Sequence, residues 1–401
     1  MTSIDLSIRY LPDVRCPACS CMGAESFYDL KGVPIDGATV FNDQQSARNS
    51  ACGDISLCLC ENCGYIFNKV FDESVFNNQG SYQDQQGYSP AFQKYAEQLS
   101  NDLIAKYHLN EKVIVEIGCG KGDFLKLLVE KGNNTGIGID PKSTHAGPSK
   151  DNIRLRFLKE HYAAAHKRLM PDFICCRHTL EHVNNPLEFI RTLRRAITSN
   201  HSPDIFFELP DMTRILDEAA FWDIYYEHCG YYCPESLRGL FLRCGFLVSS
   251  VNSTYHKQHL VLHAAPGPAS QMENIDDSAR SRTIRDLVLR FNRQIEKKAF
   301  FWNNLTADAA DNQKRIVIWG SGSKCVGFFS LLNAAAHIEY IVDINPHRHG
   351  TYLPRFAKKI VAPSFLTQYK PDIVIIMNPV YEEEISFSLN DMRLNPKIYC
   401  L

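Results

Sequence analysis

The sequence predicts an α/β protein with a large Rossmann-like core, a second and smaller Rossmann-like domain after it, and a small cysteine-rich domain in front. Three observations support this fold class. The chain has 401 residues, whereas single hydrophobic cores stop growing at about 250–300 residues. The order strand, glycine turn, helix occurs twice, beginning near residues 113 and 315. Seven of the 15 cysteines lie within residues 16–63.

The composition is that of a globular protein rather than of a disordered or fibrous chain, with 45% hydrophobic and 22% charged residues. The net charge of −2 argues against a nucleic-acid or membrane-surface partner, because such binding needs a clustered excess of Lys and Arg. No run of about 18 apolar residues is present, and the first residues lack the basic start and apolar middle of a signal peptide. We therefore expect a cytoplasmic protein.

The cysteine-rich segment carries two Cys-x-x-Cys pairs, Cys16 with Cys19 and Cys60 with Cys63. This spacing lets two thiolates from one tight turn occupy two corners of a tetrahedron around zinc. Gly64 follows the second pair and suits a turn that needs a positive φ. Four protein ligands leave no open position, so we predict a structural zinc. The alternatives are scattered reduced cysteines, a redox pair, or replacement of one ligand by Cys21, Cys52 or Cys58.

The large core begins with an apolar strand at 113–117, a glycine turn and an amphipathic helix. The turn is Gly118-x-Gly120-x-Gly122, preceded by Glu116, and the next strand ends on Asp140. Such an arrangement is typical of dinucleotide binding. Its spacing resembles motif I of class I S-adenosylmethionine-dependent methyltransferases. That resemblance implies glycines approached by the cofactor's methionine part and ribose, a carboxylate of Asp140 on the ribose hydroxyls, and Glu116 near the ammonium group.

The residues that follow continue the same core. "DFICCR" and "DIFFELP" are expected as strands, with a helix in "PLEFIRTLRRAI" between them. "CGFLVSSV" and "QHLVLHAAP" are expected to close the sheet as an antiparallel hairpin. That order resembles the methyltransferase sheet and differs from that of a nucleotide-binding dehydrogenase. We therefore predict a methyltransferase domain over 76–265, after a zinc-binding domain over 1–75.

A Pro-, Ser- and Gly-rich linker and a long helix, expected from Ile284 to about Asn304, fill residues 266–310. Residues 311–401 are predicted to form the smaller doubly wound domain, with parallel strands in "PDIVIIMNP" and "KIYCL". Backbone amides and an ammonium group in its glycine turn would hold a phosphate at a helix N-terminus, through Gly320, Gly322, Ser323 and Lys324. Cys325 replaces the third glycine of a GxGxxG fingerprint, which argues against NAD. The alternative is a scaffold without a ligand.

Several segments together resemble the bacterial nucleotide-sugar C-methyltransferases of branched deoxysugar biosynthesis: the cysteine pairs, "EIGCGKG", "HTLEHV", "YYEHCGYY", and "WGSGSK" followed by "VDINPHRHG". The resemblance covers about residues 16–400. It implies S-adenosylmethionine and zinc as cofactors and methylation next to a keto group, at C3 of a 4-keto-6-deoxy sugar. It also implies a nucleotide-diphosphate sugar as the small-molecule partner of a monomer or weak homo-oligomer.

The resemblance also assigns roles within "YYEHCGYY". A base removes the proton next to the keto group, and the resulting enolate attacks the cofactor's methyl group. His228 would be this base, since histidine titrates near neutral pH without large perturbation. Glu227 would orient the base or stabilise charge, and Tyr225 would donate a hydrogen bond toward the keto oxygen or enolate. Tyr231 and Tyr232 are expected in the core.

Two residues outside that segment match family site positions. His182, in "HTLEHV", corresponds to the other site histidine, and Tyr82 corresponds to a tyrosine over the substrate, with Tyr88 as the alternative. Three other functions fit parts of the same pattern: methylation of a small molecule that is not a sugar, methylation of RNA, and nicotinamide-dependent oxidation at either glycine turn. Few basic residues accompany the cysteines, which disfavours RNA.

Overall fold

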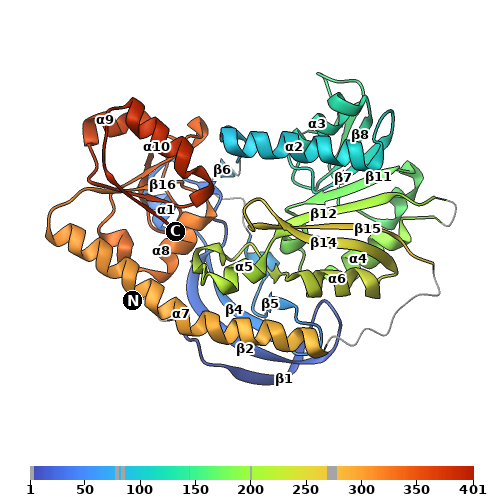
Figure 1. The fold of residues 1–401 in the computed structure, drawn as a ribbon, viewed down its shortest axis with the longest axis horizontal. Coiled ribbons are helices and arrows are strands. Elements are labelled where there is room, and N and C mark those ends of the chain that lie inside the picture. The colour runs from blue at the N-terminus through green and yellow to red at the C-terminus, as the bar shows by residue number, and fades with distance from the viewer. Residues whose placement is uncertain (1–3, 77–80, 83–85, 144, 199–200, 269–277) are drawn as a thin grey trace.

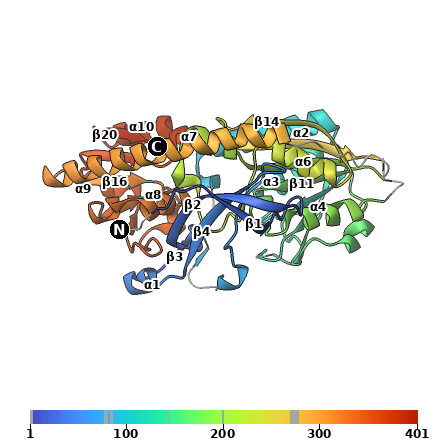
Figure 2. The same cartoon turned by 90° about the horizontal axis from the view of Figure 1, so that it is seen from below.

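Three main sheets organise the chain, one for each expected domain. The structure is a computed structural model and describes residues 4–76, 81–82, 86–143, 145–198, 201–268 and 278–401. In Figure 1 the large core lies on the right, the C-terminal domain on the left, and the strands of the cysteine-rich domain below and between them. Figure 2 shows the same central position of β1 and β2 from below. The cysteine-rich domain therefore joins the two Rossmann-like domains.

The cysteine-rich sheet has the order β1-β2-β4-β5-β13 and is antiparallel throughout. Its strands are β1 Arg9–Arg15, β2 Met22–Pro34, β4 Cys52–Cys60, β5 Ile66–Asn68 and β13 Gly230–Tyr231. Between β2 and β4 lie β3 Thr39–Val40, which pairs with β6 Ser81–Tyr82, and α1 Gln44–Arg48. Because β13 belongs to "YYEHCGYY", that segment of the large core completes the sheet of the preceding domain.

The sheet of the large core has the order β14-β15-β12-β11-β7-β8-β10-β9. Its central strands run parallel and are β7 Val113–Ile117, β8 Thr135–Ile139, β10 Leu155–Leu158, β11 Phe173–Arg177 and β12 Asp204–Pro210. β15 His259–Pro266 runs antiparallel to both β12 and β14 Phe246–Thr254, and β9 Gly147–Pro148 borders β10. This order confirms the predicted closing hairpin.

Helices cover both faces of this sheet, and short 3₁₀ turns follow its strands. The helices are α2 Pro90–Tyr107, α3 Asp123–Gly132, α4 Pro186–Arg195, α5 Met212–Asp217 and α6 Pro234–Arg243. α2 begins where the Ser89 side chain accepts a hydrogen bond from the Phe92 amide and Pro90 occupies the first helical position. The turns η4 Leu180–His182 and η5 Phe221–Asp223 follow β11 and α5. In such sheets ligands bind beyond the carboxyl ends of the parallel strands.

The C-terminal domain is a parallel sheet of order β18-β17-β16-β19-β20. Its strands are β16 Ile316–Trp319, β17 Tyr340–Val342, β18 Lys359–Val361, β19 Ile373–Ile376 and β20 Lys397–Cys400, and its helices are α8 Ser323–Leu331, α9 Leu366–Tyr369 and α10 Glu382–Asp391. The order, counted along the chain as 3-2-1-4-5, is that of a doubly wound fold. The predicted fold class is confirmed for both Rossmann-like domains.

Helix α7, Ser278–Asp311, is longer than the predicted helix and holds the domains together. Its Arg285 pairs with Glu25 of β2 at 2.7 Å, and its Trp302 packs against Phe328 of α8 with ring centroids 5.5 Å apart. One hydrophobic cluster runs from the cysteine-rich sheet through α5 and α7 into the C-terminal sheet. Among the described residues, none of the helices combines the length and apolar character that crossing a membrane requires.

Candidate active site

The four predicted metal ligands lie together at one end of the cysteine-rich sheet. The Sγ atoms of Cys16, Cys19, Cys60 and Cys63 all lie within 4.8 Å of one another. Each pair closes a matching turn, with a hydrogen bond from Ser20 N to Cys16 O and another from Gly64 N to Cys60 O, both 2.9 Å. Gly64 has φ of 69°, which confirms the left-handed turn predicted there, and Ser20 has a matching φ of 66° that the sequence did not indicate.

This cluster fits a tetrahedral zinc ion. Zn–S bonds of about 2.3 Å place neighbouring sulfurs about 3.8 Å apart, and the Cys16–Cys63 and Cys19–Cys60 sulfurs are 3.7 and 3.6 Å apart. Three of the four cysteines are buried, in a hydrophobic cluster shared with the large core. Cys21, Cys52 and Cys58 do not belong to the cluster of four. A bound ion would hold the two knuckles against the large core.

The glycine turn after β7 contains glycines of two kinds. A Cβ on Gly118 would meet Thr179 at 1.9 Å, and one on Gly122 would meet Phe157 at 2.5 Å, so both are required by packing within the chain. A Cβ on Gly120 would meet nothing within 4 Å. All three have positive φ. Only Gly120 therefore presents its backbone to open space, where a cofactor can approach.

Two carboxylates border this turn. Asp140, directly after β8, accepts hydrogen bonds from Gly120 N at 2.9 Å and Lys142 N at 2.7 Å. Glu116 is 3% exposed, and its Oε2 has no hydrogen-bond partner among the described residues. Burial raises the pKa of Glu116 to about 8, against the positive charge of Arg177. An unpartnered buried carboxyl fits the ammonium group of S-adenosylmethionine, so the residues present match the predicted cofactor.

The loop after β11, which contains His182, packs on the glycine turn after β7. Thr179, the residue that Gly118 accommodates, begins this loop, and η4 ends it on His182. The His182 Nδ1 atom lies 2.7 Å from the main-chain oxygen of Glu227. The two predicted catalytic segments, which are 45 residues apart, are thus joined beside the cofactor turn.

Three of the four tyrosines of the segment "YYEHCGYY" are buried in the core. Tyr226, Tyr231 and Tyr232 are 1%, 3% and 0% exposed, which confirms the core role expected for the last two. Tyr225 instead faces His228, with ring centroids 4.4 Å apart. The His228 ring also stands edge-on to that of His182, at 4.8 Å. Tyr225, His182 and His228 therefore form one cluster of hydrogen-bonding side chains.

Glu227 lies where all three domains meet, which the sequence did not indicate. Its Oε1 accepts a hydrogen bond from Gly37 N of the cysteine-rich domain at 3.2 Å and one from Ser323 Oγ of the C-terminal domain at 2.7 Å. Its Oε2 is buried and has no partner among the described residues. Burial and the nearby charge of Asp36 raise the pKa of Glu227 to about 8. The surroundings therefore favour the protonated form of this carboxyl group.

The environment of His228 lowers its pKa, whereas that of Glu227 raises the pKa of the carboxyl group. The residue is 7% exposed, and its Nδ1 atom has no hydrogen-bond partner in the described part of the chain. Burial, together with the positive charges of His182, His178 and Lys324, holds the pKa of His228 well below its ordinary value. The expectation of an unperturbed histidine is thus wrong. His228 is neutral at pH 7 and has an available nitrogen.

The glycine turn of the C-terminal domain faces the large core. Lys324 is ion-paired with Asp223 of η5, which also binds Arg214, and Ser323 is bonded to Glu227. Gly320 and Gly322 begin the turn, and Asp343 accepts a hydrogen bond from Ser321 N at 2.9 Å. Binding of a phosphate by Lys324, as the sequence predicts, would require its ammonium group to leave Asp223. In the structure the turn holds Glu227 and η5.

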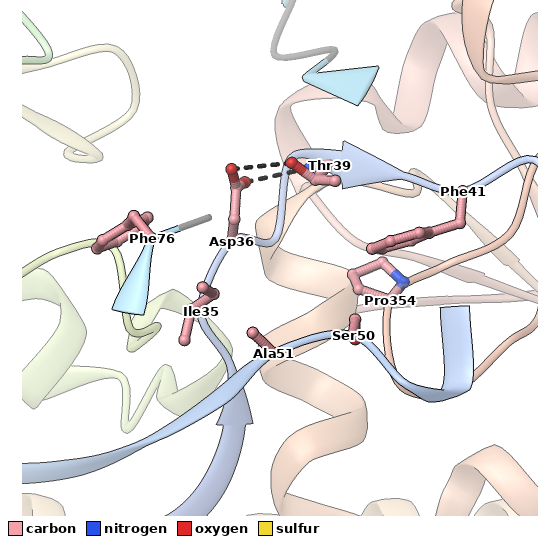
Figure 3. A pocket seen from close by; sticks show the side chains of 8 residues that line it. All are labelled: Ile35, Asp36, Thr39, Phe41, Ser50, Ala51, Phe76 and Pro354. Atoms are coloured by element: carbon pink, nitrogen blue, oxygen red, sulfur yellow. Dashed lines mark hydrogen bonds between the residues drawn. The ribbon is translucent and has the colours of Figure 1, made fainter. Parts of the chain in front are cut away.

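A pocket opens beside this junction. It is lined by Ile35, Asp36, Thr39, Phe41, Ser50, Ala51, Phe76 and Pro354, drawn in Figure 3. Asp36 is turned toward Thr39, whose hydroxyl donates to it at 2.9 Å. Gly37, the next residue, contacts Glu227. Tyr82 belongs to β6, which pairs with β3 near this pocket, but its side chain lies outside the described part.

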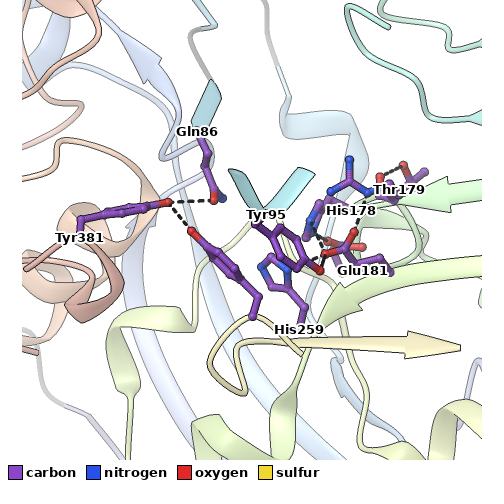
Figure 4. A network of polar contacts seen from close by, with 10 residues as sticks. Gln86, Tyr95, His178, Thr179, Glu181, His259 and Tyr381 are labelled. Carbon is purple, nitrogen blue, oxygen red and sulfur yellow. Dashed lines mark hydrogen bonds and ion pairs between the residues drawn. The ribbon is translucent and has the colours of Figure 1, made fainter. Parts of the chain in front are cut away.

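A second polar network, missed at the sequence level, lies at the ends of β11 and β12 (Figure 4). The buried Glu208 accepts from Arg177 at 2.5 Å, from Tyr95 at 2.6 Å, and contacts His259 Nδ1 at 2.7 Å. Burial opposes ionisation of Glu208, but the charge of Arg177, the hydrogen bond to His259 and the charge of His178 prevail and hold its pKa well below the usual range. The signal available in sequence was the pair of polar strand ends "CRH" and "ELP".

Two family descriptions match this chain. A methyltransferase domain matches residues 91–251, and a C-methyltransferase C-terminal domain matches residues 264–396. Among curated proteins, C-methyltransferase NovU from Streptomyces niveus is 21% identical over 390 residues, which cover 92% of this chain and 90% of that protein. The similarity to NovU therefore extends over all three domains.

Solved structures resemble part of the chain. Magnesium protoporphyrin IX methyltransferase from Synechocystis PCC 6803, with bound S-adenosylhomocysteine, covers 47% of this chain and 90% of its own, with 14% identity and a TM-score of 0.34. The 1,6-didemethyltoxoflavin-N1-methyltransferase from Burkholderia thailandensis covers 43% and 79%, with 10% identity and a TM-score of 0.33.

Proposed function

The chain is an S-adenosylmethionine-dependent methyltransferase that combines a methyltransferase domain with a C-methyltransferase C-terminal domain, and from this premise we propose that it methylates a carbon next to a keto group of a nucleotide-activated deoxysugar. The position proposed is C3 of a 4-keto-6-deoxy sugar. The sugar and its nucleotide rest on the resemblance of the sequence motifs. The C-methyltransferase match supports methyl transfer to carbon.

The observation that carries the proposal is the pairing of a neutral base with a neutral acid in adjacent residues. His228 has an unpartnered buried nitrogen, and Glu227 has an unpartnered buried carboxyl oxygen. Enolisation of a ketone requires a base for the proton on carbon and a donor for the developing oxygen charge. Tyr225 and His182 border the same space. Methyl transfer to oxygen or nitrogen would not need such a pair.

In the proposed mechanism, neutral His228 accepts the proton bound to the acceptor carbon, and the electron pair stays on the acceptor as an enolate. Glu227, protonated on Oε2, donates a hydrogen bond to the enolate oxygen, because Oε1 is occupied by Gly37 and Ser323. Tyr225 gives a second donor to that oxygen. A carboxylic acid that stays neutral at pH 7 in an apolar site can stabilise an enolate in this way.

The cofactor, when bound, supplies the methyl group. Glu116 would bind its ammonium group, and Asp140 would bind its ribose hydroxyls. The backbone of Gly120 would lie against its methionine part and ribose. The loop that bears His182 packs directly on this turn, so the acceptor cluster and the cofactor site share one wall. The zinc ion would have a structural role, since its four ligands leave no position for a substrate.

The test is incubation of the purified protein with S-adenosylmethionine and nucleotide-linked 4-keto-6-deoxy sugars. Mass spectrometry should show the gain of one methyl group, and carbon NMR should place it on the carbon next to the ketone. Thermal unfolding with nucleoside diphosphates and S-adenosylhomocysteine would select the nucleotide beforehand, since ligands that bind the folded state stabilise it. Methylation of free keto acids but of no nucleotide sugar would overturn the proposed substrate class.

A further inference from the structure

A line of buried titratable residues leads away from His228. Glu181, the residue before His182, is 2% exposed, and its Oε2 has no hydrogen-bond partner in the described part of the chain. One ligand atom each of Glu181, His182 and His228 lies within 4.8 Å of the others. Such a distance fits proton transfer through one intervening water. Glu181 Oε2 and His228 Nδ1, which belong to two of these three residues, are both buried and have no hydrogen-bond partner in the described part of the chain.

The other oxygen of Glu181 faces a second histidine. Glu181 Oε1 lies 3.6 Å from His178 Nδ1, and His178 Nε2 lies 3.8 Å from Glu208 Oε1. The His178 side chain is 31% exposed, unlike the two carboxylates on either side. Its backbone has φ of +46°, which is uncommon for a residue other than glycine and recurs at functional sites. The fold therefore holds a partly exposed imidazole, whose Nε2 atom is itself buried, between two buried carboxylates.

The surroundings favour the charged form of His178. Burial opposes protonation, but the hydrogen bond to Glu181 and the charges of Glu208 and Glu181 prevail over burial and over Arg177, so the pKa of His178 is raised. His259, whose ring lies 4.5 Å away, has a pKa lowered to about 4 by burial and by the charge of His178. Glu208 cannot pass the proton further, because Arg177, Tyr95 and His259 already occupy its oxygens.

We propose that Glu181 and His178 form a proton exit path, which carries the proton taken up by His228 away from the acceptor. The inference rests on the proposed function. After abstraction His228 is an imidazolium beside His182 and Lys324, an unfavourable place for a positive charge. Its proton passes to the Glu181 carboxylate and then to His178, after His178 has released a proton to water. No electrons move, and His228 and Glu181 return to their starting forms.

Blocking the exit path should have a different measurable effect from removing the base His228. With S-adenosylhomocysteine in place of the methyl donor, a proton removed by His228 must leave the site before solvent deuterium can replace it. When the exit is blocked, the same proton returns to the same carbon. Exchange with solvent then slows although abstraction continues. A single round of methylation needs only one proton to be removed, so it is not slowed.

The experiment compares wild type, Glu181→Gln and His178→Asn by two assays, deuterium exchange by NMR and single-turnover methylation by quenched mass spectrometry. Both variants should exchange about 10²-fold more slowly, keep near wild-type single-turnover methylation, and recover exchange in added formate or imidazole. Glu160→Gln is the matched control, since Glu160 also pairs with a histidine, His166 at 2.8 Å, in another part of the domain. Calorimetry with S-adenosylhomocysteine confirms folding of each variant.

Several outcomes would overturn the path. Equal losses in both assays would mean that Glu181 only orients His228. If Glu181→Gln and His178→Asn both exchange at the wild-type rate, the proton does not leave through these residues. If only His182→Asn loses exchange, the proton leaves through His182. If wild type itself neither exchanges nor methylates any nucleotide-linked keto sugar, the proposed function fails and the path with it. Normal exchange by wild type and by Glu181→Gln, in contrast, removes the path alone.

Discussion

The Nδ1 atom of His182 lies 2.7 Å from the main-chain oxygen of Glu227. A carbonyl oxygen only accepts, so the His182 Nδ1 atom carries the proton of this hydrogen bond. This bond joins the loop on the cofactor turn to the segment that carries the base and the acid. It makes His182 a positioning residue for Glu227 and His228 in addition to any contact with the acceptor.

Substitution of His182 separates these roles. Asparagine places an amide N–H near the position of Nδ1, so His182→Asn should keep the bond to Glu227 and most of the turnover. His182→Ala should lose about two- to tenfold in kcat, the value of one hydrogen bond of about 0.5–1.5 kcal/mol. Steady-state kinetics checks this. An equally large loss in both variants would show instead that the imidazole itself acts on the acceptor.

His228→Ala should bind S-adenosylhomocysteine with wild-type affinity but lose about 10²–10⁴-fold in turnover, as expected for removal of a general base. It should also lose exchange of the acceptor's α-hydrogen for solvent deuterium, because no other group starts the reaction. Calorimetry and NMR supply the two readouts. Retained exchange with lost methylation would exclude His228 as the base and favour His182.

Activity should fall as the pH rises through about 8, the pKa of Glu227. The pKa is raised, so the protonated donor is present below this pH and the ionised carboxylate replaces it above. Glu227→Gln keeps an N–H donor that does not titrate, and its kcat should remain constant over the same range. A high-pH decrease that persists in Glu227→Gln would assign that decrease to another group.

One zinc ion per chain should be found by elemental analysis of the purified protein. Cys16→Ser or Cys60→Ser should lose the metal and lower the unfolding temperature, because the remaining three thiols would then lack the ion that holds them together. Cys52→Ser is the control, since Cys52 is exposed and lies outside the cluster. A metal-free protein that stays folded and fully active would contradict a zinc site.

Asp140→Ala should weaken S-adenosylmethionine binding by about 1.5–3 kcal/mol, the value of hydrogen bonds to a charged group. Part of the loss would come from the glycine turn, because Asp140 also accepts from Gly120 N. Asp140→Asn keeps one acceptor oxygen and should lose less. Calorimetry measures both affinities. Unchanged binding in the alanine variant would place the cofactor ribose elsewhere.

The features that the sequence predicted correctly depend on residues close together in the chain. Cys16 and Cys19, like Cys60 and Cys63, are placed by one tight turn each, so spacing alone identified the cluster. The strand, glycine turn and following acid of the large core are likewise local, and the closing hairpin is formed by consecutive strands. Local spacing determines these elements because the backbone geometry of a turn or hairpin involves few residues.

The properties of the catalytic groups were decided by the tertiary structure alone. Glu227 is bonded to Gly37 and Ser323, which lie 190 and 96 residues away in sequence, and no local pattern specifies either contact. Lys324 pairs with Asp223, and His178 lies between Glu181 and Glu208, for the same reason. A pKa depends on burial and on charges within a few ångströms. The sequence therefore identified the chemical groups of the site, whereas the packing of three domains set their protonation states and partners.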